Sequence, residues 1–583
     1  MALVRFHLSF HSQPNVAEPQ LRMRAICRSF SRQPAISTIT NSRFQQPSFI
    51  PSRVSTSFSL PAYISSHPRR PIHITPNMSS SVSYQKALSR LSALQSNLAI
   101  TSLFTVPLPD GTDRNAAAIP EMLFWLSRAG LSPESIASSG LKCVHVAGTK
   151  GKGSVSAFVG SILAQYSNPP TQKVGVYTSP HLVDQRERIS LLSPQEKEGM
   201  IDEEKFGKYV NLVWDTMTAE ARKQLGAEAK EEELEGPGTK PFYFRFLTIV
   251  ALRAFLGEGV RDAVVECGIG GEYDSTNVLT EKSVSAAVVT QLGIDHVGML
   301  GDTVEKIAWH KAGIFKRGVK AFTIRHPRET VGEVLRERAR EKGAELVEIG
   351  EEEVKGWKGV EGGMLQGPFQ KGNMALAVYA AREHLVKTGH KFEGRFGLDE
   401  EWGLDDIPDK FVKGLREASL RGRCEVVRDG KDGTEWLVDG AHTEDSLAGV
   451  GEWFASRGGD GLRVLVFNQQ ERDPKILLTA LLKGAEKEAS GSKEVFTHAF
   501  FTRNEELPPK EGEKRDQSVQ TKALEIMKEY NGEVESRVSD NVQLTIEGVK
   551  YLTAKARAEG KECRVLATGS FHLVGTVLKR ISA

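Results

Sequence analysis

Cysteine is scarce in this sequence, with five residues in 583 and no two of them arranged as a C-x-x-C pair. This pattern excludes a disulfide framework and a cysteine-based zinc site, and it is typical of a protein kept in a reducing compartment. Long apolar runs are also missing, since no stretch approaches the roughly 18 consecutive apolar residues of a transmembrane helix. We therefore expect no transmembrane segment.

Lysine and acidic residues are almost absent from residues 1–77, which carry nine arginines, no lysine and a single acid, Glu18. The segment is rich in serine and proline, and this arginine-rich, acid-poor composition is the signature of an organelle transit peptide. We expect a disordered mitochondrial leader over residues 1–77. Translation from Met78 would give a cytoplasmic form without the leader.

Without the leader, the chain has no excess of positive charge. Removing nine arginines and one acid from the formal net charge of +2 leaves −6 for residues 78–583. A mildly acidic body argues against general nucleic-acid binding. The 39% hydrophobic and 26% charged content is ordinary for a globular protein.

The stretch CVHVAGTKGKGSVSAF, residues 143–158, departs from the usual spacing of a phosphate loop. In the common form G-x-x-x-x-G-K-[ST] the hydroxyl residue follows the lysine directly, whereas Gly153 separates Lys152 from Ser154 here. A predicted strand at 144–146 and a predicted helix at 154–163 flank three glycines, which let backbone N–H groups point at phosphate oxygens. The loop therefore predicts phosphate binding, with Lys152 supplying charge and Ser154 a hydroxyl.

Two series of short β-branched runs alternate with helical stretches. The first comprises 143–146, 173–177, 262–266 and 284–290, and the second 424–427, 435–438, 463–467, 498–501 and 564–567. Such alternation indicates buried parallel strands in an α/β fold. We predict two lobes: an N-terminal P-loop ATPase-like domain with a mainly parallel sheet over 78–410, and a smaller C-terminal Rossmann-like α/β domain over 411–583. A charged, exposed helical insertion is expected at 194–241.

Polar residues follow several of these strands, where ligands of parallel sheets usually bind. Ser179, Glu266, His296 and Asp439 each lie at or just after a strand, and Arg423 precedes one. Taken singly, a strand-end carboxylate or a loop histidine is more often structural. Five such positions spread over two lobes predict a nucleotide and metal site in a cleft.

The motifs occur in a fixed order, GTKGKGS at 148–154, TSPHL at 178–182 with RERI at 186–189, ECGIGG at 266–271, LGIDH at 292–296 with GDTVEKIAWHKAGIFK at 301–316, and DGAHT at 439–443. In this order they resemble the folylpolyglutamate synthases, which are ATP-dependent amide ligases related to the bacterial cell-wall Mur ligases. The resemblance covers residues 80–583 apart from the charged insertions. The loop sequence GTKGKGS and the stretch FYFRFLT at 242–248 resemble those of the eukaryotic branch of the family.

The resemblance implies roles for individual residues. The ATP contacts would be Gly148, Thr149, Gly151, Lys152, Gly153, Ser154, Asn373, Arg423 and Asp439. The Mg²⁺ ligands would be Ser179, Glu266 and His296. The catalytic residues would be Lys152, Lys311 and His296. Lys311 matches the lysine that bacterial relatives carry as a carbamate. One departure is visible, since relatives often have His-Gln where this chain has Phe369-Gln370.

The resemblance further implies the reaction. Attack of the γ-carboxylate of a tetrahydrofolate mono- or polyglutamate on ATP would give an acyl phosphate and ADP, and the amine of L-glutamate would then displace phosphate. Both partners in the first step are anions, which Lys152, Arg423 and Mg²⁺ would neutralise. We expect ATP and Mg²⁺ as cofactors, with K⁺ as a further candidate. Tetrahydrofolate and L-glutamate would be the substrates of a monomeric enzyme.

Three alternatives stay open at this point. A dihydrofolate synthase, joining glutamate to dihydropteroate, would share every ATP and metal residue. A Mur-type cell-wall ligase would carry a full sugar-nucleotide domain before the loop, whereas residues 78–142 hold only about two predicted helices. A non-catalytic P-loop switch module would not need Glu266 or His296, and the guanine-reading N-K-x-D motif of GTPases is missing.

Overall fold

The computed structural model describes residues 82–94, 114–196, 199–226, 228–367, 369–397, 402–430, 433–469 and 473–581. All of them belong to one compact unit, Ser80–Ala583. The predicted leader, residues 1–77, and the candidate start Met78 lie outside the described residues. Among the described helices, none combines the length and apolar character needed to cross a membrane.

The first sheet has seven strands in the order β3-β2-β4-β1-β5-β6-β7. The strands are β1 Lys142–Ala147, β2 Val174–Tyr177, β3 Ile189–Leu192, β4 Asp262–Glu266, β5 Val284–Val289, β6 Lys320–Ile324 and β7 Glu345–Ile349. All neighbours are parallel except β2 and β3. Because parallel strands share their carboxyl edge, β1, β4 and β5 deliver Ala147, Glu266 and Val289 to the same side of the sheet.

Helices cover both faces of this sheet. They are α2 Val82–Ala93, α4 Ala118–Arg128, α5 Pro133–Ser138, α6 Lys152–Ala164, α7 Glu203–Leu225, α8 Glu231–Glu235, α9 Tyr243–Gly257, α10 Val297–Leu300, α11 Val304–Lys311, α12 Glu329–Lys342, α13 Glu351–Gly356, α14 Gln370–Lys387 and α15 Asp409–Glu417. Val144 and Val146 pack into the core formed with α6 and α14, while Cys143 faces the core formed with α9. Alternate residues of β1 therefore serve opposite faces, as strand geometry requires.

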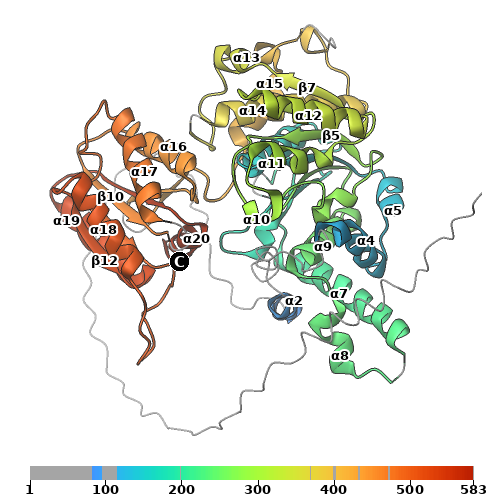
Figure 1. Ribbon diagram of the computed structural model, residues 1–583, viewed down its shortest axis with the longest axis horizontal. Helices are drawn as coiled ribbons and strands as arrows, with labels where there is room; N and C mark the ends of the chain where they lie inside the picture. The colour runs from blue at the N-terminus through green and yellow to red at the C-terminus, as the bar shows by residue number, and fades with distance from the viewer. Residues whose placement is uncertain are drawn as a thin grey trace, which may run out of the picture. The chain divides into compact units, whose positions relative to one another are not determined.

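The second sheet has six strands in the order β12-β11-β10-β13-β9-β8. They are β8 Glu425–Arg428, β9 Glu435–Val438, β10 Leu462–Phe467, β11 His498–Thr502, β12 Glu535–Ser539 and β13 Cys563–Thr568. Only β8 runs antiparallel to its neighbour. The flanking helices are α16 Glu444–Ala455, α17 Pro474–Glu488, α18 Ser518–Tyr530, α19 Val542–Ala558 and α20 Phe571–Ile581 (Figure 1). The predicted α/β class with two mainly parallel sheets is confirmed.

The sequence did not predict the strands that lack a continuous apolar run. The unpredicted strands are β3, β6, β7 and β12. β7 reads ELVEI and β12 reads ESRVS, and both lie at sheet edges where most of their residues stay partly exposed. An edge strand buries only part of its surface, so its sequence does not need the apolar run that marks a central strand.

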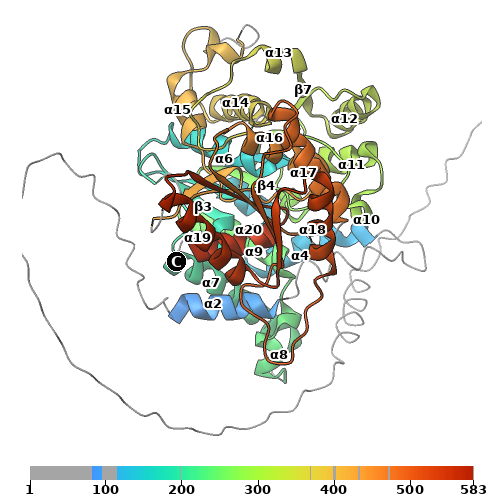
Figure 2. The ribbon, with the colours of Figure 1, turned by 90° about the vertical axis from the view of Figure 1, so that its left-hand side faces the viewer.

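The charged insertion 194–241 is helical as predicted, but its longest helix is not merely exposed. α7 buries Phe206, Val210, Val213 and Trp214, and it packs against α2 and α9 (Figure 2). The remaining charged residues of α7 follow the opposite face. The helix is therefore amphipathic and part of the core.

The predicted division at residue 410 falls inside α15. This helix packs on α6, where a methyl group at Gly414 would lie 2.6 Å from the Cα atom of Ile162. α15 therefore lies on the first sheet's side, and the change from one sheet to the other comes after Glu417.

Two glycines let α16 and α17 pack with their backbones nearly in contact. A methyl group at Gly451 would lie 2.1 Å from the carbonyl oxygen of Leu481, and one at Gly484 would lie 2.1 Å from that of Ala448. No larger side chain fits either position without a shift of backbone. α16 starts at the edge of the cleft described below, so its placement bears on the site.

We predict that Gly451→Ala destabilises the protein by about 1–3 kcal/mol, because the added methyl forces α16 and α17 apart. Thermal and urea unfolding of the purified protein would measure this loss. Gly356→Ala is the matched control, since nothing lies within 4 Å of its added methyl. Equal unfolding midpoints for Gly451→Ala and the unaltered protein would contradict the packing argument.

Candidate functional site

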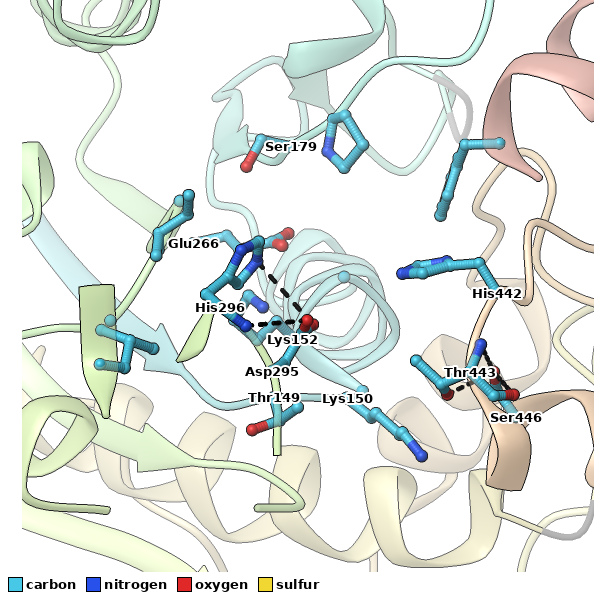
Figure 3. A pocket seen from close by; sticks show the side chains of 18 of the residues that line it. Thr149, Lys150, Lys152, Ser179, Glu266, Asp295, His296, His442, Thr443 and Ser446 are labelled. Atoms are coloured by element: carbon cyan, nitrogen blue, oxygen red, sulfur yellow. Dashed lines mark hydrogen bonds and ion pairs between the residues drawn. The ribbon is translucent and has the colours of Figure 1, made fainter. Parts of the chain in front are cut away.

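A cleft of about 800 Å³ opens at the carboxyl edges of the two sheets. Its lining includes the loop 149–154, Ser179, Glu266, His296 and Asn373 from the first sheet's side. Arg423, Asp439 and His442 line it from the second sheet's side. Figure 3 shows Lys152, Glu266 and His296 close together, with His442, Thr443 and Ser446 across the cleft from them. Eleven of the thirteen predicted site residues line this cleft, while Gly148 and Lys311 are not among its lining residues.

The phosphate loop ends in α6, which begins at Lys152, two residues earlier than predicted. Gly151 is the residue before the helix and has a φ of 85°, a left-handed conformation that favours glycine. A methyl group there would lie 2.3 Å from Oδ1 of Asn373. Lys152 and Gly153 therefore belong to the first helical turn, whose N–H groups have no partner within the helix.

Gly153, the residue that breaks the usual spacing, is packed from two sides. A methyl group on it would lie 2.9 Å from Cδ2 of Leu420 and 3.6 Å from Oε2 of Glu266. The additional glycine thus lets the helix start approach Glu266 and the chain that leads to the second sheet. Its role here is close packing, since its φ is not left-handed.

Backbone and side-chain hydrogen bonds hold the loop against the chain after β5. The N–H groups of Thr149 and Lys150 donate to the carbonyl oxygen of Gln291 over 2.9 and 3.1 Å. The hydroxyl of Thr149 donates to Gly293, and that of Thr290 donates to Lys150. Thr149 also lines the cleft, and its predicted contact with the nucleotide stays a prediction.

Two lysines share one backbone acceptor beneath the loop. Nζ of Lys152 and Nζ of Lys311 donate to the carbonyl oxygen of Gly148 over 2.9 and 2.8 Å. Lys311 is only 3% exposed, and burial together with the nearby charge of Lys152 lowers its pKa to about 7. A neutral amine at this position is therefore accessible near pH 7, which is unusual for lysine.

Glu266 ends β4 and is 2% exposed. Burial raises its pKa to about 7, although Lys152 and Arg423 act in the opposite direction. Its Oε2 atom has no hydrogen-bond partner. A buried carboxylate oxygen without a donor is suited to a cation, which would favour the ionised form.

The predicted Mg²⁺ ligands differ in how well they suit that ion. Mg²⁺ prefers oxygen ligands and keeps several waters, so the carboxylate of Glu266 and the hydroxyl of Ser179 fit it. The imidazole nitrogen of His296 is a poorer ligand. Among the described residues, no three His, Cys, Asp or Glu side chains gather closely enough to hold a metal ion. Water and phosphate oxygens would therefore complete the coordination.

His296 occupies a left-handed backbone position, with a φ of 50°, directly before α10. Its N–H donates to Oδ1 of Asp295 over 3.0 Å, and its side chain is about half exposed. Burial lowers the pKa of His296, and Lys152 and Lys311 lower it further, although the carboxylate of Asp295 acts in the opposite direction. The imidazole is therefore neutral at pH 7 and can accept a proton.

Asp439 fixes the turn that presents Arg423. Its two carboxylate oxygens accept the N–H groups of Cys424 and Ala441 over 2.7 and 2.8 Å. Arg423 lies over the ring of Phe571, 4.2 Å from its centre. Asp439 thus joins the backbone just before β8 to the backbone just after β9, and its predicted contact with the nucleotide stays a prediction.

Sequence reasoning missed Gln370. Its amide nitrogen donates to the hydroxyl of Ser154 over 3.2 Å, and its amide oxygen accepts from Asn373 over 2.9 Å. One turn of α14 thus links Asn373 to the phosphate loop. The i, i+3 spacing of Gln370 and Asn373 was a usable signal. Lys150 was also missed, and it pairs with Asp445 of α16 over 2.7 Å.

Comparisons with known proteins reveal relatives across most of the chain. A folylpolyglutamate synthase of Saccharomyces cerevisiae is 35% identical over 501 residues, covering 85% of this chain and 86% of the yeast protein. No protein-family model matches the chain.

Solved structures share the fold. A Mycobacterium tuberculosis folylpolyglutamate synthase complexed with ADP superposes with a TM-score of 0.61 at 21% identity, covering 87% of this chain and 99% of that one. E. coli FolC in complex with DHPP and ADP superposes with a TM-score of 0.56 at 22% identity, covering 86% and 98%.

We predict that Glu266→Gln removes a pH-dependent loss of stability from the metal-free protein. The pKa of Glu266 is raised in the folded state, so the folded protein holds this proton more tightly than the unfolded chain does. The resulting stabilisation is fully present below pH 4.5 and is lost as pH rises toward 7. Relative to the unaltered protein, the variant should gain up to roughly 3 kcal/mol across that window, at about 1.36 kcal/mol per pKa unit. Urea unfolding with EDTA at pH 4.5, 6 and 7.5 would measure the difference, and a constant offset would refute the burial argument.

Proposed function

The chain belongs to the folylpolyglutamate synthase family, and we propose that its cleft extends tetrahydrofolate by way of an acyl phosphate. It is an ATP-dependent ligase that joins glutamate to folate. The family resemblance seen in the motif order is confirmed. The observation that carries the proposed chemistry is the convergence of the phosphate loop, Glu266 and Arg423 on one cleft.

The first step would join two anions. An oxygen of the acceptor's γ-carboxylate attacks the γ-phosphorus of ATP, the bond from that phosphorus to the β,γ-bridging oxygen breaks, and ADP leaves. Lys152 at the start of α6 and Arg423 opposite it would neutralise the charge that builds up. The first-turn N–H groups of α6 add a partial positive charge at the phosphates.

We propose that Glu266 and Ser179 hold Mg²⁺ beside those phosphates. The ion, when bound, would supply a Lewis acid for the transferred phosphoryl group. The unpartnered Oε2 of Glu266 supports this assignment. The role of Lys311, a carbamate on it and the K⁺ requirement stay predictions.

The second step would join the incoming amine to the activated carboxyl. The amine nitrogen attacks the carbonyl carbon, phosphate leaves with the oxygen it received, and the nitrogen loses a proton. The neutral imidazole of His296 lines the cleft and is suited to take that proton. Because walls from both sheets enclose the site, water that would hydrolyse the acyl phosphate can be excluded.

We predict that Lys152→Ala abolishes ATP-dependent glutamate incorporation, because the variant lacks the charge that neutralises the phosphates. Incorporation of labelled glutamate into tetrahydrofolate would measure the loss. Lys173→Ala is the control, since Lys173 pairs with Glu196 and does not line the cleft. Near-normal incorporation by Lys152→Ala would refute the assignment of the loop.

The choice of acceptor tests the function itself. We expect labelled glutamate to be added to tetrahydrofolate, with ADP and phosphate as the other products. Dihydropteroate is the competing acceptor in the same assay. Activity with dihydropteroate alone would identify a dihydrofolate synthase instead.

A further inference from the structure

Arg188 is a nearly buried cation in the wall of the cleft, and the reaction steps above do not use it. It ends the short helical turn Gln185–Arg188 and directly precedes β3. The residue is 5% exposed and lines the cleft beside Phe242 and Phe244. It therefore presents positive charge to the cleft from within a largely apolar wall.

The protein uses only part of the Arg188 guanidinium. Nε donates to Nδ1 of His181 over 2.8 Å, and the guanidinium carbon lies 5.5 Å from the centre of the Tyr243 ring. Nη1 is buried and has no hydrogen-bond partner. None of the described carboxylates forms an ion pair with Arg188. Because Nδ1 of His181 accepts the bond from Nε, it carries no proton and the ring brings no charge to Arg188.

The other arginines of the lining are engaged differently. Arg245 pairs with Glu121, and Arg423 lies over Phe571 near the phosphate loop. Arginine is rarely buried without a partner, and a buried donor left unpaired destabilises the folded state. Such a residue in the wall of a cleft indicates a ligand group, and the planar guanidinium fits a carboxylate through two parallel hydrogen bonds.

The position of Arg188 indicates which of the anions that enter the cleft it would bind. The phosphates of ATP would already be bound by Lys152, Arg423 and the start of α6. Arg188 lies close enough to Glu266 for its charge to act on that carboxyl group, and the aromatic wall lies beside it. An acceptor with its γ-carboxylate at the phosphate end would carry a second carboxylate on the same glutamate, one that takes no part in the chemistry.

We propose that Arg188 binds the α-carboxylate of the acceptor's terminal glutamate, and so selects acceptors that already end in glutamate. The inference rests on the proposed function and specifies its substrate contact. Dihydropteroate has no such α-carboxylate, so Arg188 would favour chain extension over addition of the first glutamate. Each product again ends in glutamate and offers the same group for the next round.

The test combines two acceptors with three variants. The acceptors are tetrahydrofolate and an analogue in which 4-aminobutyrate replaces the glutamate, which keeps the γ-carboxylate and lacks the α-carboxylate. The variants are Arg188→Gln, Arg188→Lys and, as matched control, Arg186→Gln. Arg186 lies two residues away, pairs with Asp184 over 2.7 Å and does not line the cleft.

We expect the unaltered enzyme to use the analogue about 10- to 100-fold less efficiently than tetrahydrofolate, the usual range for a lost hydrogen-bonded charge pair. Arg188→Gln should lower kcat/KM for tetrahydrofolate by a similar factor and leave kcat/KM for the analogue nearly unchanged. Arg188→Lys should fall between, and Arg186→Gln should keep the acceptor preference of the unaltered enzyme.

A merely structural role for Arg188 would lower kcat/KM for both acceptors by the same factor, and that result would overturn the proposal. Equal use of both acceptors by the unaltered enzyme would overturn it as well, and this arm needs no variant to fold. Failure of the proposed function is distinguishable, because the unaltered enzyme would then add no glutamate to tetrahydrofolate.

Discussion

The carbonyl oxygen of Gly148 accepts hydrogen bonds from the Nζ atoms of two lysines, and the arrangement of the cleft depends on this shared contact. Lys152 comes from the start of α6 and Lys311 from the end of α11, so one backbone atom joins two elements that are far apart in the sequence. Two like charges so close in a buried place are costly unless one is neutral or an anion is nearby. The lowered pKa of Lys311 shows the first solution, and a bound phosphate would provide the second.

Burial and neighbouring charges also oppose each other at Glu266, on the wall of the cleft. Glu266 is buried among Lys152, Arg423 and Arg188, yet burial outweighs them and keeps its pKa raised. Three cationic side chains around one carboxyl group form a site that suits anionic substrates. ATP and the folate acceptor are such substrates: Lys152 and Arg423 would meet the phosphates, and Arg188 the α-carboxylate of the acceptor.

Much of the fold and of the site could be predicted from the sequence. Central strands were recognisable because burial on both faces requires continuous apolar runs, whereas edge strands such as β7 and β12 carry charges and were missed. Ser179, Glu266 and His296 were found because strand-end positions in parallel sheets converge on one edge. Gln370 was missed because its partner Ser154 is more than two hundred residues away, a contact that only the packing of α14 on α6 creates.

The sequence alone determined the order of the motifs, the unusual spacing at Gly153 and hence the family, because these depend on residue identity and local geometry. It also predicted a phosphate site at the start of α6. The tertiary structure decided that Gly153 serves close packing against Leu420 and that Asp439 holds the backbone beside Arg423. It also decided that Arg188 lines the cleft and keeps one buried donor without a partner. These properties depend on burial and on contacts between distant segments, and neither is encoded in any short stretch of the chain.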